Sequence, residues 1–164
     1  MSLSISRLIV PAYVRGLQVL SRYLDKAADH ADAAALPGAR LAPDMLPLAG
    51  QIQRASDTSK NAIARLLGID APKFEDNETT LAELKVRVDK TIAFVAGADT
   101  AALDASVERD ITLAFGEFKK TFDGEDYVLS FALPNFYFHV AMAHAILRNQ
   151  GVAVGKLDYL GAAN

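Results

Sequence analysis

Apolar residues recur at alternating steps of three and four along much of the 164-residue chain. This spacing places their side chains on one side of an α-helix, where they can pack against a core. Four segments show the pattern, namely residues 4–31, 44–68, 80–97 and 134–151. Each segment is several turns long, so the pattern predicts an all-α protein in which four helices pack as a bundle.

Local signals mark the ends of these helices. Asp44 has a side chain suited to cap the second helix, and Gly68 supplies its stop. Thr80 and Glu83 have the spacing of a capping box, in which each side chain bonds a backbone N–H that the helix leaves unpaired. Pro134 lacks the N–H that a first turn leaves unpaired, so it suits the start of the last helix.

Two segments show no usable period. Residues 34–43 hold two prolines and one glycine, which predicts a connection between the first two helices. A link of this length can run along the whole bundle. Residues 152–164 are expected to be irregular.

Between residues 110 and 133 the apolar period falls to two, which is the period of a strand. Ile111, Leu113 and Phe115, and later Tyr127, Leu129 and Phe131, alternate with other residues, which predicts two short strands. Asp123 and Gly124 have the composition of a two-residue hairpin turn, which requires positive φ. The expected register places Phe118 opposite Leu129 and Lys120 opposite Tyr127. We therefore predict a short β-hairpin between the third and fourth helices.

Composition narrows the classes of function. Hydrophobic residues make up 51% of the chain and charged residues 23%, as expected for a single globular domain over residues 1–164. No apolar run approaches the ~20 residues that cross a bilayer, and the amino terminus lacks a signal-peptide pattern. These features predict a cytoplasmic protein with no membrane partner. A net charge of −3 with scattered Lys and Arg predicts no nucleic-acid partner, and the absence of cysteine excludes disulfides and thiolate ligands.

Two of the three histidines lie on the last predicted helix but point in different directions. At ~100° per residue, His139 and His144 are separated by about 140° and cannot share a metal ion within this helix. His139 shares a face with Asn135 beside the apolar face, so it either bonds a core partner such as Gln or a carbonyl, or it serves a pocket. His144 lies near Arg148 on a more polar face, which favours a solvent-facing position. His30 is placed to meet the carbonyl end of the first helix.

The second helix offers polar partners for His139. Gln51 and Asp57 flank its apolar stripe, and cavities in helical bundles are lined by side chains of facing helices. The alternative is that both residues only mark the polar boundary of the stripe. The sequence contains neither a Gly-x-Ser-x-Gly elbow nor the Glu-x-x-His pairs of di-iron bundles. The candidate ligand-binding residues are therefore Asn135, His139, Gln51 and Asp57, and no catalytic residue is assigned.

Two stretches carry a family resemblance. The segments "PNFYFH" and "AILRNQGVAVGKLDYLG", at 134–139 and 145–161, resemble the closing signature of a bacterial family within the DinB-like (DinB/YfiT) superfamily that is catalogued only as a domain of unknown function. The segment "RLAPDMLPLAGQIQRASDTSK", at 40–60, resembles the second helix of that family. With the helix order, the resemblance covers nearly the whole chain. It implies a four-helix bundle of up-down-down-up topology with a long link after the first helix, often assembled as a homodimer.

The resemblance also bears on metal binding. Better-understood superfamily members bind zinc or nickel through three histidines, one on the second helix and two in a His-x-x-x-His pair on the last. Matched on Leu147 and Arg148, this pair falls on Asn135 and His139, so only one of its histidines is present. Residues 44–68 contain no histidine, and carboxamides are weak replacements for imidazole on these metals. The resemblance therefore predicts no metal and no other cofactor.

Three functions are compatible with these observations. The leading prediction is an uncharacterised cytoplasmic DinB-like protein that lacks the three-histidine site and binds a small molecule in a cavity near Asn135 and His139. The second is a transferase or hydrolase that depends on zinc or nickel and uses His139 with a carboxylate such as Asp57. The third is a structural module whose homodimer face is its function.

Overall fold

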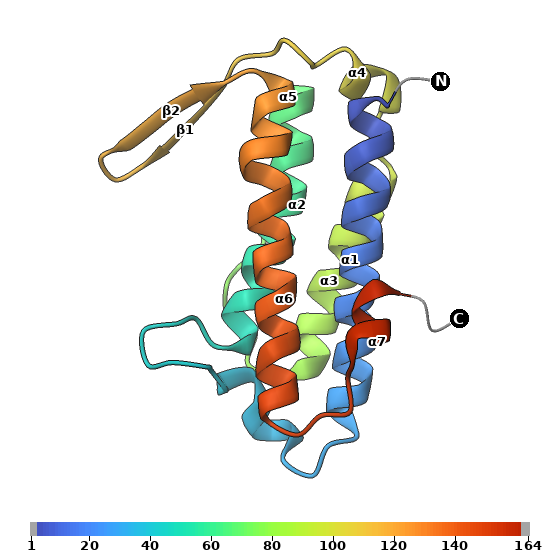
Figure 1. The fold of residues 1–164 in the computed structure, drawn as a ribbon, viewed down its shortest axis with the longest axis vertical. Coiled ribbons are helices and arrows are strands. Elements are labelled where there is room, and N and C mark those ends of the chain that lie inside the picture. The colour runs from blue at the N-terminus through green and yellow to red at the C-terminus, as the bar shows by residue number, and fades with distance from the viewer. Residues whose placement is uncertain (1–2, 162–164) are drawn as a thin grey trace.

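The computed structural model describes residues 3–161, except for the side chain of Phe118. Within that range four long helices stand side by side (Figure 1), and they are α1 (Ile5–Ala28), α2 (Leu48–Leu67), α3 (Leu81–Ala96) and α6 (Leu133–Asn149). The shorter elements are η1 (Ala33–Gly38), α4 (Thr100–Asp104), β1 (Ile111–Phe115), β2 (Phe118–Phe122), α5 (Gly124–Asp126), the π-helical η2 (Tyr127–Ala132) and α7 (Lys156–Leu160). The prediction of an all-α bundle with a small antiparallel hairpin is confirmed.

Side-chain contacts give the directions of α1 and α6. Tyr13 in the first half of α1 meets Phe136 near the start of α6, with 4.9 Å between the ring centroids. Tyr23, further along α1, bonds His144, further along α6. These two helices therefore run in the same direction. Because α1 and α2 both pack on α3 and α6, they lie diagonally across the bundle.

The helices α2 and α3 also run in the same direction. Asp57 in the first half of α2 pairs with Arg87 in the first half of α3, and Leu67 at the end of α2 shares a cavity wall with Phe94 near the end of α3. The chain must therefore return along the bundle between them, over residues 68–80. The sequence allows a link of bundle length in the connection after α1. That connection stays at one end, because α1 ends where α2 begins (Figure 1).

Arg87 fastens the returning segment to the bundle. Its side chain is only 2% exposed, and its guanidinium pairs with Asp57 on α2 at 2.8 Å and with Asp76 and Glu78 of the segment at 3.0 Å each. It also donates to the hydroxyl of Ser56 at 3.2 Å. A buried cation is stable only with such complete pairing, so this cluster fixes the relative positions of α2, α3 and residues 68–80.

The predicted hairpin register is wrong. Strand β1 pairs with β2, not with residues 127–131, and Phe115 lies opposite Phe118. The turn uses Gly116, whose φ is +56°. Asp123 instead caps α5 by accepting from a backbone N–H, and Gly124 packs so closely that a Cβ would lie 2.0 Å from the carbonyl oxygen of Ser106. Asp123 therefore caps a helix, and Gly124 allows the backbone to pack closely against Ser106.

The observed pairing gives Lys120 a different neighbour from the predicted one, and the second predicted strand is not formed. Lys120 pairs with Leu113 in the sheet and not with Tyr127. Residues 127–132 form the π-helical turn η2, which leads directly into α6. Tyr127 is fully buried there while Leu129 is half exposed. The two side chains therefore lie on different faces of this turn, whereas a strand would have placed both on one face.

Two further boundaries differ from the sequence expectations. Helix α2 begins at Leu48 with Pro47 as its N-cap, and Asp44 lies in the preceding turn. The proline explains the shift, because it disfavours helical geometry in the residue before it. Of the segment 152–164 that was predicted to be irregular, residues 162–164 lie outside the described residues, and the part after Val154 is not irregular throughout. It forms α7, which Asp158 ties to α1 through an ion pair with Lys26 at 2.8 Å.

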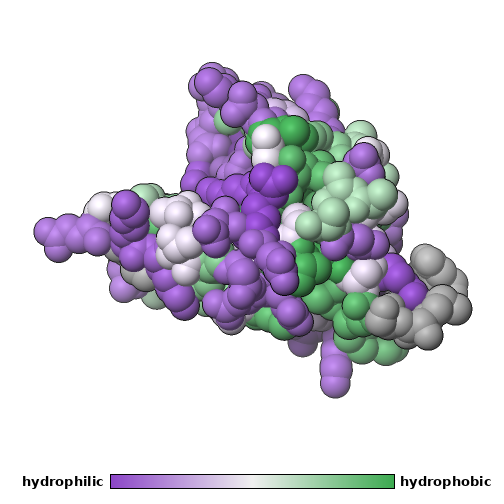
Figure 2. All heavy atoms as spheres, turned by 90° about the horizontal axis from the view of Figure 1, so that it is seen from above, coloured by the Kyte–Doolittle hydropathy of each residue, from purple (hydrophilic) through white to green (hydrophobic). Residues whose placement is uncertain are grey.

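The core fills the space between the four helices. Its largest fully buried side chains are Tyr13, Tyr23, Tyr127 and Phe136. The hairpin projects from one end of the bundle, and an end-on view shows it as mainly hydrophilic beside exposed apolar side chains (Figure 2). Across residues 3–161, none of the helices has both the length and the apolar composition that a bilayer-crossing helix needs.

Gly16 marks the closest approach of α1 to α6. A Cβ at this position would lie 2.5 Å from Cε1 of Phe136, which is fully buried. Alanine usually stabilises a helix relative to glycine by about 1 kcal/mol. Here we expect Gly16→Ala to lower the free energy of unfolding by about 1–2 kcal/mol, because overpacking a core costs more than the gain in helix propensity. Urea denaturation tests this. Gly38→Ala is the control, since no atom lies within 4 Å of its Cβ position, and an equal effect of the two changes would contradict the packing argument.

Removal of the Arg87 guanidinium should lower the stability of the protein strongly. We expect Arg87→Leu to lower the free energy of unfolding by about 3 kcal/mol, because Asp57 and Glu78 would lose their buried partner. The matched control is Lys85→Leu, which breaks an exposed pair with Asp25 and should cost less than about 1 kcal/mol. Both values come from urea denaturation at pH 7. Similar losses of free energy of unfolding in the two variants would show that the Arg87 cluster does not hold residues 68–80 in place.

Candidate functional site

A row of polar side chains joins α2 to α6 and to the η2 turn that precedes it. Three hydrogen bonds cross this interface: His139 Nδ1 to Gln51 Oε1 at 2.8 Å, Asn135 Nδ2 to Thr58 Oγ1 at 2.8 Å, and Arg65 Nη1 to the Tyr127 hydroxyl at 3.1 Å. From one bond to the next, the partner on α2 has a higher residue number while the partner on α6 or η2 has a lower one. The two helices are therefore antiparallel. The partners on α2 are seven residues apart, which is close to two turns and keeps them on one face.

The side chains of His139 and Gln51 are hydrogen-bonded to each other. The Nε2 atom of Gln51 donates to the carbonyl of Leu46 at 3.2 Å, which turns its Oε1 toward the imidazole. The Nδ1 atom of His139 therefore carries the hydrogen, and its Nε2 carries the lone pair. Desolvation, with a smaller contribution from the charge of Arg54, lowers the pKa of His139 to about 4. At neutral pH the ring is thus uncharged.

Asn135 lies in the wall of a small cavity next to this pair. The cavity has a volume of about 140 Å³. Its walls come from α2, β1, η2 and α6, through Arg54, Asp57, Thr58, Asn61, Arg65, Phe115, Tyr127, Phe131 and Asn135. Of the four predicted site residues, Asn135 and Asp57 therefore line the cavity. His139 and Gln51 do not, and they contact each other instead.

The carboxylate of Asp57 forms ion pairs with three cations. Its Oδ1 accepts from Arg87 at 2.8 Å and lies 3.1 Å from the Lys60 ammonium, while its Oδ2 lies 3.5 Å from Arg54. The predicted pairing of Asp57 with His139 is not formed in the described part of the chain. The reason is geometric, because six residues after Gln51 the helix has turned Asp57 toward α3.

The donor atoms around His139 do not suit zinc or nickel. One imidazole is present, its Nδ1 is used by Gln51, and the neighbouring groups are carboxamides and a hydroxyl. Both metals prefer several nitrogen or carboxylate ligands. In the part of the chain that the structure describes, no three His, Cys, Asp or Glu side chains lie together where they could hold one ion. The residues around His139 therefore do not fit a zinc or nickel site.

The other two histidines lie apart from this interface. His144 is half-buried, and its Nδ1 shares a hydrogen bond of 2.6 Å with the Tyr23 hydroxyl. It therefore lies between helices and not on the solvent-facing surface that the sequence suggested. His30 follows the end of α1, where its Nδ1 accepts from the backbone N–H of Asp32 at 3.2 Å.

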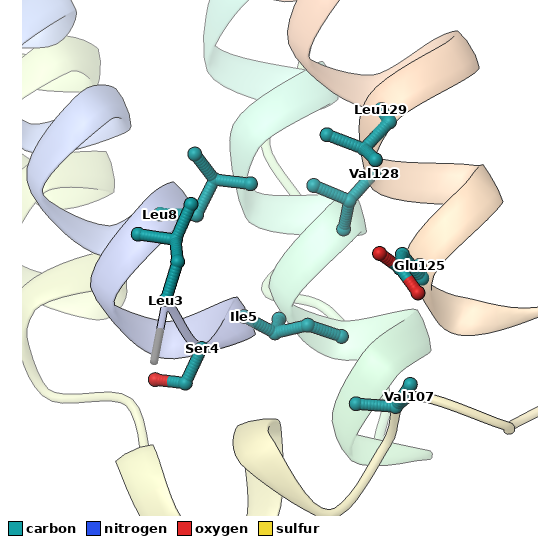
Figure 3. A pocket seen from close by; sticks show the side chains of 8 residues that line it. All are labelled: Leu3, Ser4, Ile5, Leu8, Val107, Glu125, Val128 and Leu129. Carbon is teal, nitrogen blue, oxygen red and sulfur yellow. The ribbon is translucent and has the colours of Figure 1, made fainter. Parts of the chain in front are cut away.

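A second cavity lies at the end of the bundle where α1 begins (Figure 3). Its volume is about 280 Å³ and its walls are mainly apolar. Leu8, Val128 and Leu129 form part of these walls, and Glu125 supplies the one charged side chain among them (Figure 3). None of the predicted site residues lines this cavity.

Sequence reasoning missed most of the polar side chains of the first cavity. Arg54, Thr58, Asn61 and Arg65 follow one another along α2 at steps of four, three and four. This is the same spacing that identified the apolar stripe, so a search for polar stripes would have found them. Tyr127 was missed for another reason, because its segment was assigned to a strand.

The low pKa of His139 predicts how stability depends on pH. The unfolded ring has a pKa near 6.5, so between about pH 4 and 6.5 the unfolded state binds more protons and stability falls as the pH is lowered. After allowance for partial exposure of the ring, we expect wild type to lose about 1–2 kcal/mol more than His139→Gln between pH 7 and 4.5. Urea denaturation measures this difference, and NMR should show an uncharged imidazole at pH 5. An imidazole that titrates near pH 6.5 would contradict the prediction.

Comparison with known proteins places the chain in a family. Residues 5–160 match the family model DUF1993, a domain of unknown function. A crystal structure described as a DinB family member protein from Shewanella denitrificans is 38% identical, with a TM-score of 0.87 over 95% of this chain and 91% of that one. The search of curated proteins gave no match. With its fold and nearly its whole length matched, the chain belongs to the DUF1993 family of DinB-like proteins.

Proposed function

We propose that this protein binds a small molecule in the cavity between α2 and α6. The observation that carries the proposal is the composition of the walls, where four elements bring hydroxyl, carboxamide, guanidinium and aromatic side chains to one hollow of about 140 Å³. Ligand sites combine such apolar walls with a few directed polar groups.

In this proposal His139 and Gln51 have a positioning role. Asn135 lies one helical turn before His139, so the bond between His139 and Gln51 holds α6 against α2 directly beside the cavity. The Asn135 carboxamide in turn orients the Thr58 hydroxyl. The sequence predicts a cavity near Asn135 and His139. In this proposal Asn135 lines the cavity, and His139 lies outside it and holds α6 in position.

The other predicted functions receive less support. A metal-dependent transferase or hydrolase would need His139 and a carboxylate at one site, whereas Asp57 is bound to Arg87 and Lys60. The homodimer, the cytoplasmic location and the absence of a cofactor stay predictions from the sequence.

Filling the cavity should abolish binding. Thr58→Phe places a ring in the hollow, and phenylalanine has a helix propensity close to that of threonine. In saturation-transfer NMR with a mixture of neutral and charged fragments of up to about ten heavy atoms, we expect at least one fragment to bind wild type but not Thr58→Phe. Gln18→Phe is the control, because Gln18 is exposed on α1, and it should bind as wild type does. Equal binding by Thr58→Phe would place the site elsewhere.

A further inference from the structure

Arg65 is a half-buried cation without a carboxylate partner. It lines the cavity, and its Nη1 donates to the hydroxyl of Tyr127 at 3.1 Å. In the described part of the chain it forms no ion pair. The other arginine of the walls, Arg54, pairs with Asp57 and Asp76. A partly desolvated charge without a counter-ion is unfavourable, so an anion in the cavity would be stabilised next to Arg65.

The hydroxyl groups of the walls add hydrogen-bond donors. Tyr127 accepts from Arg65, so its own hydroxyl hydrogen remains to be donated. Burial raises the pKa of Tyr127 although Arg65 opposes the shift, so the phenol stays protonated at neutral pH. Thr58 likewise accepts from Asn135 and keeps its hydrogen. A ligand with acceptor atoms would satisfy these donors.

The charges of the cavity walls do not cancel. The charged side chains that line the cavity are the cations Arg54 and Arg65 and the carboxylate Asp57. The carboxylate that lines the cavity, Asp57, already bonds two almost completely buried cations. It therefore offers little negative charge to a ligand, and the excess of one positive charge lies at Arg65.

The remaining walls are aromatic and the space is small. The ring of Phe131 stacks with Tyr127 at 6.0 Å and with Phe115 at 6.2 Å between centroids. The volume of about 140 Å³ is close to that of an engineered protein cavity of about 150 Å³ that binds benzene. A flat apolar body of about one ring would fill it.

We infer that the ligand is a small organic carboxylate of about the size of benzoate, with its carboxylate at Arg65 and the Tyr127 hydroxyl and its apolar body against Phe131. This inference rests on the proposed function, since it names the chemical class that the same cavity binds. The anionic group distinguishes it from a neutral ligand of equal shape.

Benzoate and benzamide are matched probes, because they share a ring and differ in charge. In ¹⁵N–¹H NMR titrations of the 164-residue chain at pH 7 and constant ionic strength, benzoate should shift amide signals of α2 and η2 with a Kd on the order of 1 mM. Benzamide should bind at least about tenfold more weakly, because hydrogen bonds to charged groups are the stronger ones. Acetate should also bind more weakly than benzoate, because it lacks the ring.

Variants locate the charge. Arg65→Met keeps a long side chain without the cation and should weaken benzoate binding at least about tenfold, and Arg65→Lys should restore part of the affinity. Tyr127→Phe keeps the ring and should weaken binding several-fold. Lys90→Met is the control, because it removes one positive charge from the exposed face of α3 and should leave the Kd unchanged. Thermal melting of each variant verifies that it is folded, and if Arg65→Met does not fold, Tyr127→Phe decides.

The outcomes separate the two proposals. Equal affinities for benzoate and benzamide, or an equal loss in Lys90→Met and Arg65→Met, would overturn the carboxylate class. If both probes leave the spectra unchanged while the fragment mixture still binds wild type and not Thr58→Phe, the carboxylate class is wrong and the proposed function stands. If the mixture also fails to bind, both proposals are overturned.

Discussion

The buried guanidinium of Arg87 holds together three parts of the chain that sequence order separates. From α3 it reaches Asp57 on α2 and the carboxylates of Asp76 and Glu78 on the segment that returns along the bundle. Because α2 and α3 run in the same direction, residues 68–80 must cross the bundle with little local structure of their own. A fully paired buried cation gives such a segment a single position, and it also sets the rotation of α2.

The same cluster decides the chemistry of the cavity. By taking up Asp57, it removes the carboxylate that acid–base or metal chemistry would have needed beside His139. Desolvation keeps His139 neutral, and its Nδ1 is bound to Gln51. Arg65 remains as a cation whose bonded partner in the described chain is a phenol. Asp57 and Arg65 line the same cavity, and because Asp57 is already paired with Arg87 and Lys60, the positive charge of Arg65 has no carboxylate partner in the described chain.

Sequence signals succeeded where the cause was local and failed where one signal fits two structures. The capping box at Thr80 and Glu83 is present as predicted, because it depends only on residues three apart. Asp123 and Gly124 misled, since an acidic residue before glycine suits a hairpin turn and equally suits a helix cap. The contact of Gly124 with the carbonyl of Ser106 involves a residue eighteen positions away. No local pattern contains that contact.

The sequence by itself determined the four helices, the separation of His139 from His144 around one helix, and the family to which the chain belongs. It also placed Asn135 and His139 on one face, because that follows from a spacing of four residues. Only the tertiary structure decided that His139 meets Gln51, that Asp57 turns to Arg87 and that Arg65 stays without a carboxylate. The physical reason is that such pairings depend on the directions and axial offsets of packed helices. Periodicity gives the face of each helix but not the level at which it meets its neighbour.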